Sequence, residues 1–148
     1  MPDAVIVGGG HNGLVVNQVR GLSDASGVSG LIALELLELY GLARLKALPD
    51  FSRLVRLRRL GLGQLRALAD WTPLLQLRAL EELVLSNKLY PDERVFAELG
   101  RRPHLKAFEW SAPDEPAGRV AEATRLVGRP APPARRPEEW FAANASPA

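Results

Sequence analysis

Residues 34–42 read LELLELYGL, residues 57–65 read LRRLGLGQL, and residues 80–88 read LEELVLSNK. The three segments follow one pattern, L-x-x-L-x-L-x-x-L, at a spacing of 23 residues, and only the last position of the third segment departs from it. The second and third leucines of the pattern lie two positions apart, which is the period of an extended strand. A helix would place Leu34 and Leu39 about 140° apart around its axis, off any single face. The sequence therefore predicts a short strand that recurs every 23 residues with its leucines facing a common core.

These segments resemble the leucine-rich repeat family, whose units are stacked so that each strand lies beside the next. The resemblance covers residues 11–111. It implies an α/β leucine-rich-repeat solenoid of about five short parallel strands, with irregular or 3₁₀ segments on the convex side and capping helices at the C-terminal end. The family often has Asn or Cys at the last motif position, where the side chain closes a turn. Here that position is Leu42, Leu65 or Lys88, so apolar packing is expected to hold the turn.

The flanking segments extend the repeat in both directions. Residues 11–33 carry apolar side chains at the same offsets and form a degenerate first repeat. Residues 91–100 begin with Pro and two acids, as a helix N-terminus favours, and are predicted to form an α-helix. Residues 105–110, LKAFEW, then restore the motif with bulky aromatic residues that suit a final strand at the open end of the core.

The chain is interpreted as one domain with four parts. Residues 1–10 form an N-terminal strand and glycine turn, residues 11–111 the repeats, and residues 112–128 a capping helix. Residues 129–148 are rich in Pro and Ala and are expected to be a disordered tail. Trp140 and Phe141 stand out in this tail, either as a loose contact back onto the domain or as a short linear motif for a partner.

Composition narrows the functional class. The chain has no cysteine, which favours a reducing, cytoplasmic location over secretion. Its first residues lack the basic and long apolar regions of a signal peptide, and no apolar run approaches the ~20 residues that span a bilayer, so no membrane partner is expected. A formal net charge of only +2 argues against nucleic acid as a binding partner. The arginines between the strands are interpreted as a solvated convex face, with a groove for an acidic partner as the alternative.

Residues 3–14, DAVIVGGGHNGL, resemble the N-terminus of FAD-dependent oxidoreductases of the phytoene-desaturase and amine-oxidase type. Gly8, Gly10 and Gly13 match the G-x-G-x-x-G spacing, which in that family brings backbone amides to a pyrophosphate at the start of a helix. Glu35 lies near the position of the family's ribose-binding acid. This resemblance implies FAD as a cofactor and makes the chain a fragment or fusion of such an enzyme. The segment after Gly13 is broken by three further glycines and no substrate domain remains, so the repeat register favours the solenoid.

Little else in the sequence points to catalysis. The two histidines lie in different repeats, so no metal-ligand set is expected, and the adjacent acid pairs are interpreted as surface charge. The predicted function is a non-enzymatic module that binds a protein partner on the concave strand face. The mixture of charged, aromatic and small residues there suits a protein better than a phosphate backbone. Gly61 and Gly63 are expected to leave space for a partner side chain. The residues expected to contact the partner are Leu36, Glu38, Tyr40, Arg59, Gln64, Glu82, Ser86, Asn87 and Glu109.

Overall fold

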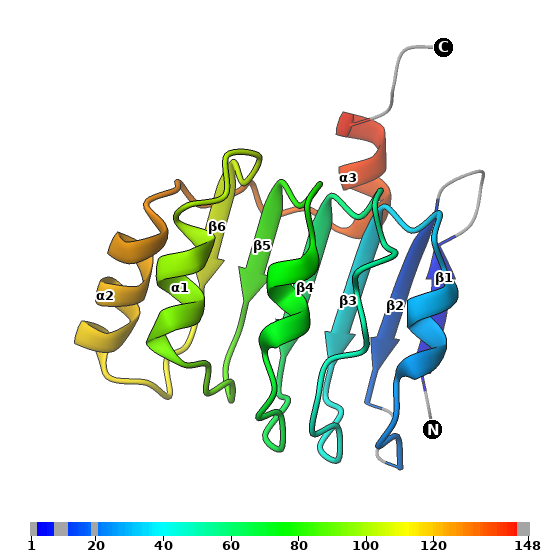
Figure 1. The fold of residues 1–148 in the computed structure, drawn as a ribbon, viewed down its shortest axis with the longest axis horizontal. Coiled ribbons are helices and arrows are strands. Elements are labelled where there is room, and N and C mark those ends of the chain that lie inside the picture. Colours follow the sequence, from blue (N-terminus) through cyan, green and yellow to red (C-terminus); the bar gives the residue numbers. More distant parts are fainter. Residues whose placement is uncertain (1–2, 8–11, 19–20, 145–148) are drawn as a thin grey trace.

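The computed structural model of the protein describes residues 3–7, 12–18 and 21–144. Six strands form one sheet in chain order (Figure 1). Strands β2 to β6 run parallel, whereas β1 pairs antiparallel with β2. The predicted α/β class with five parallel strands is confirmed. The strands are β1 (Asp3–Val7), β2 (Gly13–Asn17), β3 (Leu36–Tyr40), β4 (Arg59–Gly63), β5 (Glu82–Leu85) and β6 (Ala107–Trp110).

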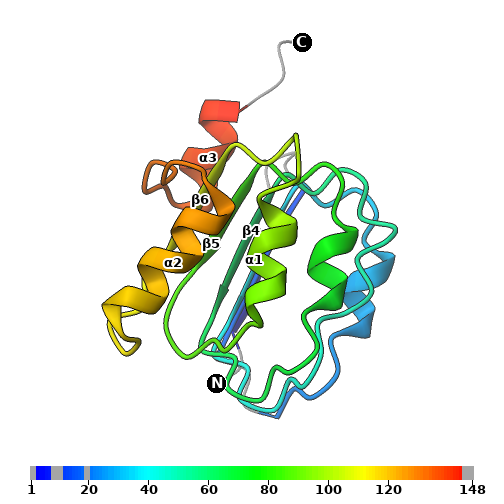
Figure 2. The same ribbon diagram turned by 60° about the vertical axis from the view of Figure 1, so that its left-hand side comes forward.

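The pairing of the strands follows the spacing seen in the sequence. Leu37 pairs with Leu60, and Leu60 pairs with Leu83. Leu14 pairs with Leu37, so β2 keeps the register predicted for the degenerate first repeat. Neighbouring parallel strands require the chain to return to the same end of the sheet after each strand. These return segments all lie on one side of the sheet (Figure 2).

The return segments are short helices and turns. Two are 3₁₀ helices, η1 (Ser26–Gly30) and η2 (Thr72–Gln76), which confirms the expected 3₁₀ geometry. The segment between β5 and β6 contains α1 (Glu93–Leu99), the helix predicted near residues 91–100, and the segment between β3 and β4 consists of turns. Asp92 caps α1, because its side chain accepts a hydrogen bond of 2.9 Å from the backbone N–H of Arg94. None of the helices in the described ranges is long and apolar enough to cross a bilayer.

The main core lies between the sheet and the return segments. Leucines at the motif positions of β3, β4 and β5 are at most 1% exposed. Leu42 and Leu65, at the turn position, are fully buried as expected, and burying a leucine contributes about 1.5–3 kcal/mol. Lys88 replaces this leucine in the third copy. It has φ 57°, and its backbone N–H donates to the Asp114 carboxylate at 3.1 Å.

Aromatic side chains and a helix close the core beyond β5. The Phe96 ring of α1 lies 6.0 Å from the Phe108 ring and 5.3 Å from the Trp110 ring, centroid to centroid. Helix α2 (Ala117–Val127) lies beside α1 and buries Ala123 and Val127 in the same core. The structure thus places a helix within residues 112–128, where the sequence predicts a capping helix.

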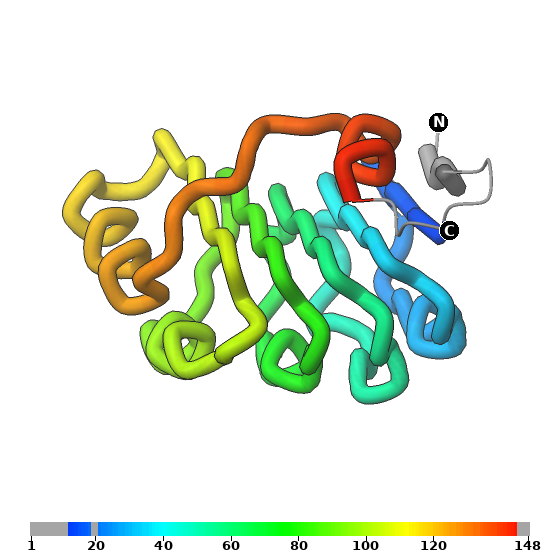
Figure 3. Tube along the Cα trace, turned by 90° about the horizontal axis from the view of Figure 1, so that it is seen from above, coloured from blue at the N-terminus to red at the C-terminus, as the bar shows by residue number. Residues whose placement is uncertain are grey.

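The segment after α2 is anchored and then crosses the sheet. The guanidinium group of Arg129 donates to the carbonyl oxygens of Leu105 at 2.6 Å and of Arg102 at 2.8 Å. The carbonyl oxygen of Pro130 accepts a hydrogen bond of 2.9 Å from the backbone N–H of Phe108, in β6. Seen from above, the chain then passes over the side of the sheet away from the return segments, and residues 137–144 lie beside the N-terminal strands (Figure 3).

The tail forms a helix, α3 (Pro137–Asn144), so the expectation of disorder over residues 129–148 is wrong for these positions. Trp140 is 1% exposed and Phe141 is 3% exposed. Composition suggested disorder because it averages over the segment, whereas one adjacent aromatic pair carries enough apolar area to dock a short helix. Residues 145–148, together with Gly8 and Gly10 of the predicted glycine turn, lie outside the described residues.

Candidate binding surface

The sheet has a second face, opposite the core, which we call the outer sheet face. Successive side chains of a strand point to opposite faces, so this face is made by the residues between the core leucines. It is the face that the sequence predicts to bind a partner. Its residues are Val15 of β2, Leu36, Glu38 and Tyr40 of β3, Arg59, Gly61 and Gly63 of β4, Glu82 and Val84 of β5, and Ala107 and Glu109 of β6.

Helix α3 covers part of the outer sheet face. Trp140 and Phe141 form an apolar cluster with Leu36, and Val15 packs against it. Leu36 is fully buried, although the sequence predicts it as an exposed partner contact. The cause of this correction is the tail, which fills the place assigned to a partner. The cluster is separate from the main core, so the sheet is covered on both faces by different parts of the chain.

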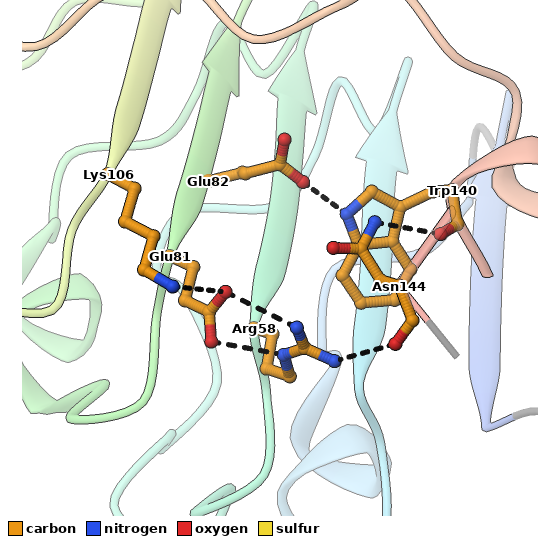
Figure 4. Close-up of polar contacts among 6 residues, drawn as sticks. All are labelled: Arg58, Glu81, Glu82, Lys106, Trp140 and Asn144. Carbon is orange, nitrogen blue, oxygen red and sulfur yellow. Dashed lines mark hydrogen bonds and ion pairs between the residues drawn. The ribbon is translucent and has the colours of Figure 1, made fainter. Parts of the chain in front are cut away.

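Polar contacts fix the indole ring of Trp140 (Figure 4). The Arg58 guanidinium carbon lies 5.2 Å from the ring centroid, a cation–π contact. The indole Nε1 donates a hydrogen bond to the Glu82 carboxylate. Arg58 also donates to the carbonyl oxygen of Asn144 at 3.3 Å, near the end of α3. One cation and one carboxylate therefore hold the ring from two directions.

Arg58 is positioned without the tail. It donates two hydrogen bonds to the Glu81 carboxylate, at 3.1 and 3.3 Å, in the bidentate geometry that guanidinium favours. The Lys106 ammonium lies 3.5 Å from the same carboxylate. Partial burial raises the pKa of Glu81, but the hydrogen bonds and charge of Arg58, together with Lys106, outweigh it and leave the pKa below its usual value. Glu81 is thus held ionised as the anchor of Arg58.

Arg59 and two acids form a buried charged cluster next to the indole. Arg59 is 5% exposed, and its Nη1 lies 3.7 Å from Glu82 Oε2 while its Nε lies 4.0 Å from Glu38 Oε2. Neither nitrogen has a hydrogen-bond partner among the described residues. Burial raises the pKa of Glu38, Arg59 opposes the shift, and the carboxylate of Glu138 in α3 adds to it. Arg59 and Glu38 were predicted to meet a partner, but in this structure they lie buried.

Tyr40 fills the space over the glycines of β4. A Cβ at Gly63 would stand 2.8 Å from Tyr40 Cδ1 and 1.9 Å from Ser86 Oγ, and one at Gly61 would stand 2.5 Å from the Tyr40 hydroxyl. The expected space for a partner side chain is therefore occupied from within, which corrects that prediction. The register explains it, because Tyr40 pairs with Gly63 and its ring extends over the neighbouring strand. Burial, with a smaller contribution from Glu38, raises the pKa of Tyr40 to about 12.

The remaining predicted contacts lie toward the carboxyl ends of β4 to β6. Gln64, Ser86 and Asn87 are half-buried, and Glu109 is exposed. Gln64 has φ 52°, and its side chain accepts a hydrogen bond of 3.4 Å from Gln18. A groove of about 420 Å³ opens there. It is lined by Gln18, Gly21, Gly41, Ala43, Arg44, Gln64, Arg66 and Lys88.

Gly13 and Glu35, the described positions of the flavin alternative, do not lie in a helix that follows a strand and turn. Gly13 begins β2 and pairs with Val7 of the antiparallel β1, where the oxidoreductase resemblance implies the start of a helix. Glu35 precedes β3, and its backbone N–H donates to the carbonyl oxygen of Asn12 at 2.8 Å. Within the described ranges, no group of three His, Cys, Asp or Glu side chains is placed to hold a metal ion.

Sequence reasoning missed Arg58 as a site residue and left the role of Trp140 open. A signal for Arg58 was present, because the residues that precede successive strands are Glu35, Arg58, Glu81 and Lys106, and the register stacks them with alternating charge. The signal for Trp140 was its aromatic neighbour in an otherwise Pro- and Ala-rich segment. Comparison of the chain with protein-family models, curated proteins and solved structures found no match.

Proposed function

We propose that the chain is a leucine-rich-repeat solenoid that acts as a non-enzymatic protein-interaction module, and that the outer sheet face binds a protein partner. The docking of α3 is the observation that carries this proposal. A helix from outside the sheet buries two aromatic side chains on that face and leaves only 1% and 3% of them exposed. A surface that holds one helix through apolar, cation–π and hydrogen-bond contacts has the chemistry that helix recognition uses.

The repeat interpretation has three supports. Parallel strands pair at the 23-residue spacing, their leucines fill one core, and 3₁₀ or α-helical segments return along one side. Stacked units of this kind bury a core that no single unit can close, and they leave a broad strand face for binding.

The charge pattern of the outer sheet face also favours a protein partner. Arg59 is paired with Glu38 and Glu82, so neither charge sign dominates the covered part. The uncovered part offers amide, hydroxyl and carboxylate groups from Gln64, Asn87, Ser86 and Glu109. Mixed polar groups around an aromatic and aliphatic centre are typical of protein interfaces.

A peptide-display selection on the immobilised full chain tests the proposal. We expect enriched peptides whose binding is lost when Glu109→Arg, on the outer sheet face, and Asn87→Arg, beyond the carboxyl end of β5, are introduced together. The same peptides should still bind a matched control with Arg56→Glu, an exposed position on the return side. Failure to enrich any peptide, or enrichment that responds only to Arg56→Glu, would contradict the proposal. Titration with FAD, followed by tryptophan fluorescence, tests the flavin alternative. That alternative requires stoichiometric quenching, whereas the proposed interaction module requires none.

A further inference from the structure

We propose that α3 is an exchangeable internal ligand, and that the partner binds through a helix that presents an indole to the same site. We call this place the α3 site and define it by Val15, Leu36, Arg58 and Glu82. The inference rests on the proposed function and adds the chemistry of the partner and the way in which access to it is controlled. In the free chain the tail blocks the α3 site, and the partner's helix displaces it.

The tail can leave without opening the main core. Trp140 and Phe141 pack with Leu36 in a cluster of their own, and no residue of α3 belongs to the core of stacked leucines. The connection from α2 contains exposed residues at positions 131, 133, 134 and 136. Three prolines, at positions 130, 132 and 133, keep this connection extended. Because the connection is not helical, α3 can be released without breaking a helix.

The α3 site selects an indole over other aromatic groups. Arg58 is held by two hydrogen bonds to Glu81, a residue outside the tail, so we expect the cation that faces the ring to stay in place when the tail leaves. Glu82 supplies an acceptor at the ring edge, and the indole combines a broad face for Arg58 with an N–H that donates to this carboxylate, whereas phenylalanine has no donor. A partner helix that ends near Arg58 also gains the contact that the Asn144 carbonyl now makes.

The tail is an imperfect ligand, which makes exchange possible. With the tail docked, the buried side chain of Arg59 still has two guanidinium nitrogens without hydrogen-bond partners among the described residues. The tail also brings the carboxylate of Glu138 toward Glu38, a like charge. A partner with a hydrogen-bond acceptor for Arg59 and without an acid opposite Glu38 therefore binds the α3 site more tightly than the tail does.

The connection between α2 and α3 determines how strongly the docked tail weakens the binding of a competing helix. For an effective concentration of about 1 mM across this short, extended connection, and an assumed intrinsic Kd of about 100 µM, α3 would be docked roughly 90% of the time. A competitor finds the α3 site open in only about a tenth of the molecules, so its apparent Kd is about tenfold higher than its intrinsic Kd. A variant whose tail is undocked should therefore bind the competitor about tenfold more tightly than the wild type does.

Fluorescence polarisation with a labelled peptide of residues 129–148 tests the inference on the full chain. We expect the variant with Trp140→Ala and Phe141→Ala to bind the peptide about tenfold more tightly than the wild type does. A matched control, Glu122→Ala on the exposed face of α2, should bind like the wild type. A peptide in which the tryptophan is replaced by alanine should not bind. Circular dichroism of the double variant should lose no more than the small helical signal of α3, because the main core is unchanged.

Equal affinity of the wild type and the double variant would overturn the inference, because the tail would then not compete. Absence of peptide binding to a folded double variant would overturn it as well, since the site would not take the helix in trans. Either result leaves the proposed function intact if peptides from the display selection still require Glu109 and Asn87. Loss of those peptides would instead count against the function.

Discussion

The two faces of the same strands are filled in different ways. On the core face, leucine meets leucine across neighbouring strands, as Leu37, Leu60 and Leu83 do. On the outer sheet face, each row changes from strand to strand, and Leu36 neighbours Arg59, which neighbours Glu82. The repeated face is packed by the repeats themselves. The face without repetition is packed by a tail that is distant in sequence, and local pattern alone does not reveal it.

Core substitutions should have the largest effect. Leu60→Ala and Leu83→Ala should each lower the free energy of unfolding by roughly 2–5 kcal/mol, because each leaves a cavity in a stacked core. Both leucines are fully buried. Urea denaturation measures the loss, and an effect no larger than that of an exposed substitution would mean that the core face is not packed as described.

Adding a methyl group at Gly63, on the outer sheet face, should lower the free energy of unfolding by less than the leucine substitutions do. Gly63→Ala places a Cβ 1.9 Å from Ser86 Oγ and 2.8 Å from Tyr40 Cδ1, so we expect a loss of stability. Overpacking of this kind costs about 1–3 kcal/mol. Part of the loss should be recovered in combination with Ser86→Ala, which removes the closer atom. Urea denaturation measures the loss of stability. If Gly63→Ala lowers the free energy of unfolding equally with and without Ser86→Ala, the clash with Ser86 Oγ is not its cause.

Docking of the tail should depend on pH. Burial raises the pKa of Glu38, and the Glu138 carboxylate of the tail raises it further, so docking favours the neutral form of Glu38. The stabilisation is fully present below the ordinary carboxyl pKa of 4.5 and is lost as pH rises through the raised value. The charged groups around Glu38 are Arg59 of β4, Glu82 of β5 and Glu138 of α3.

The labelled tail peptide and the tail-undocked double variant provide the measurement. Peptide affinity should rise severalfold as pH falls from neutral toward 4.5, and Glu38→Gln should flatten the profile. A profile that is unchanged by Glu38→Gln would assign the pH dependence to the other two acids.

The smallest effect is expected at Arg66, which is exposed. Arg66→Ala should change the free energy of unfolding by no more than about 0.5 kcal/mol, as is usual for a surface position. This variant is the reference against which the leucine variants are read in the same urea titration. A loss comparable with that of Leu60→Ala would mean that the groove beside Gln64 has a structural role.

The core face and the strand order were predictable, because hydrophobic period and spacing act locally and repeat. The ring of Tyr40 over Gly63 was within reach of the same register, since aligning Leu37 with Leu60 already places these two residues side by side. The docking of α3 was not predictable, because a single Trp and Phe pair has no period. Its binding site depends on Arg58, which precedes β4, and on Glu82 of β5. Non-local contacts of this kind require the assembled sheet.

The hydrogen bond from the Phe108 backbone N–H to the Pro130 carbonyl oxygen occupies part of the free edge of β6. The free edge of a terminal strand is a template on which other chains extend the sheet. Here the edge of β6 is engaged by a proline, whose nitrogen has no hydrogen to offer to the next chain, so growth stops at that residue. Shortened versions of the protein that end at Val127 would expose this edge and should form aggregates that the full chain resists.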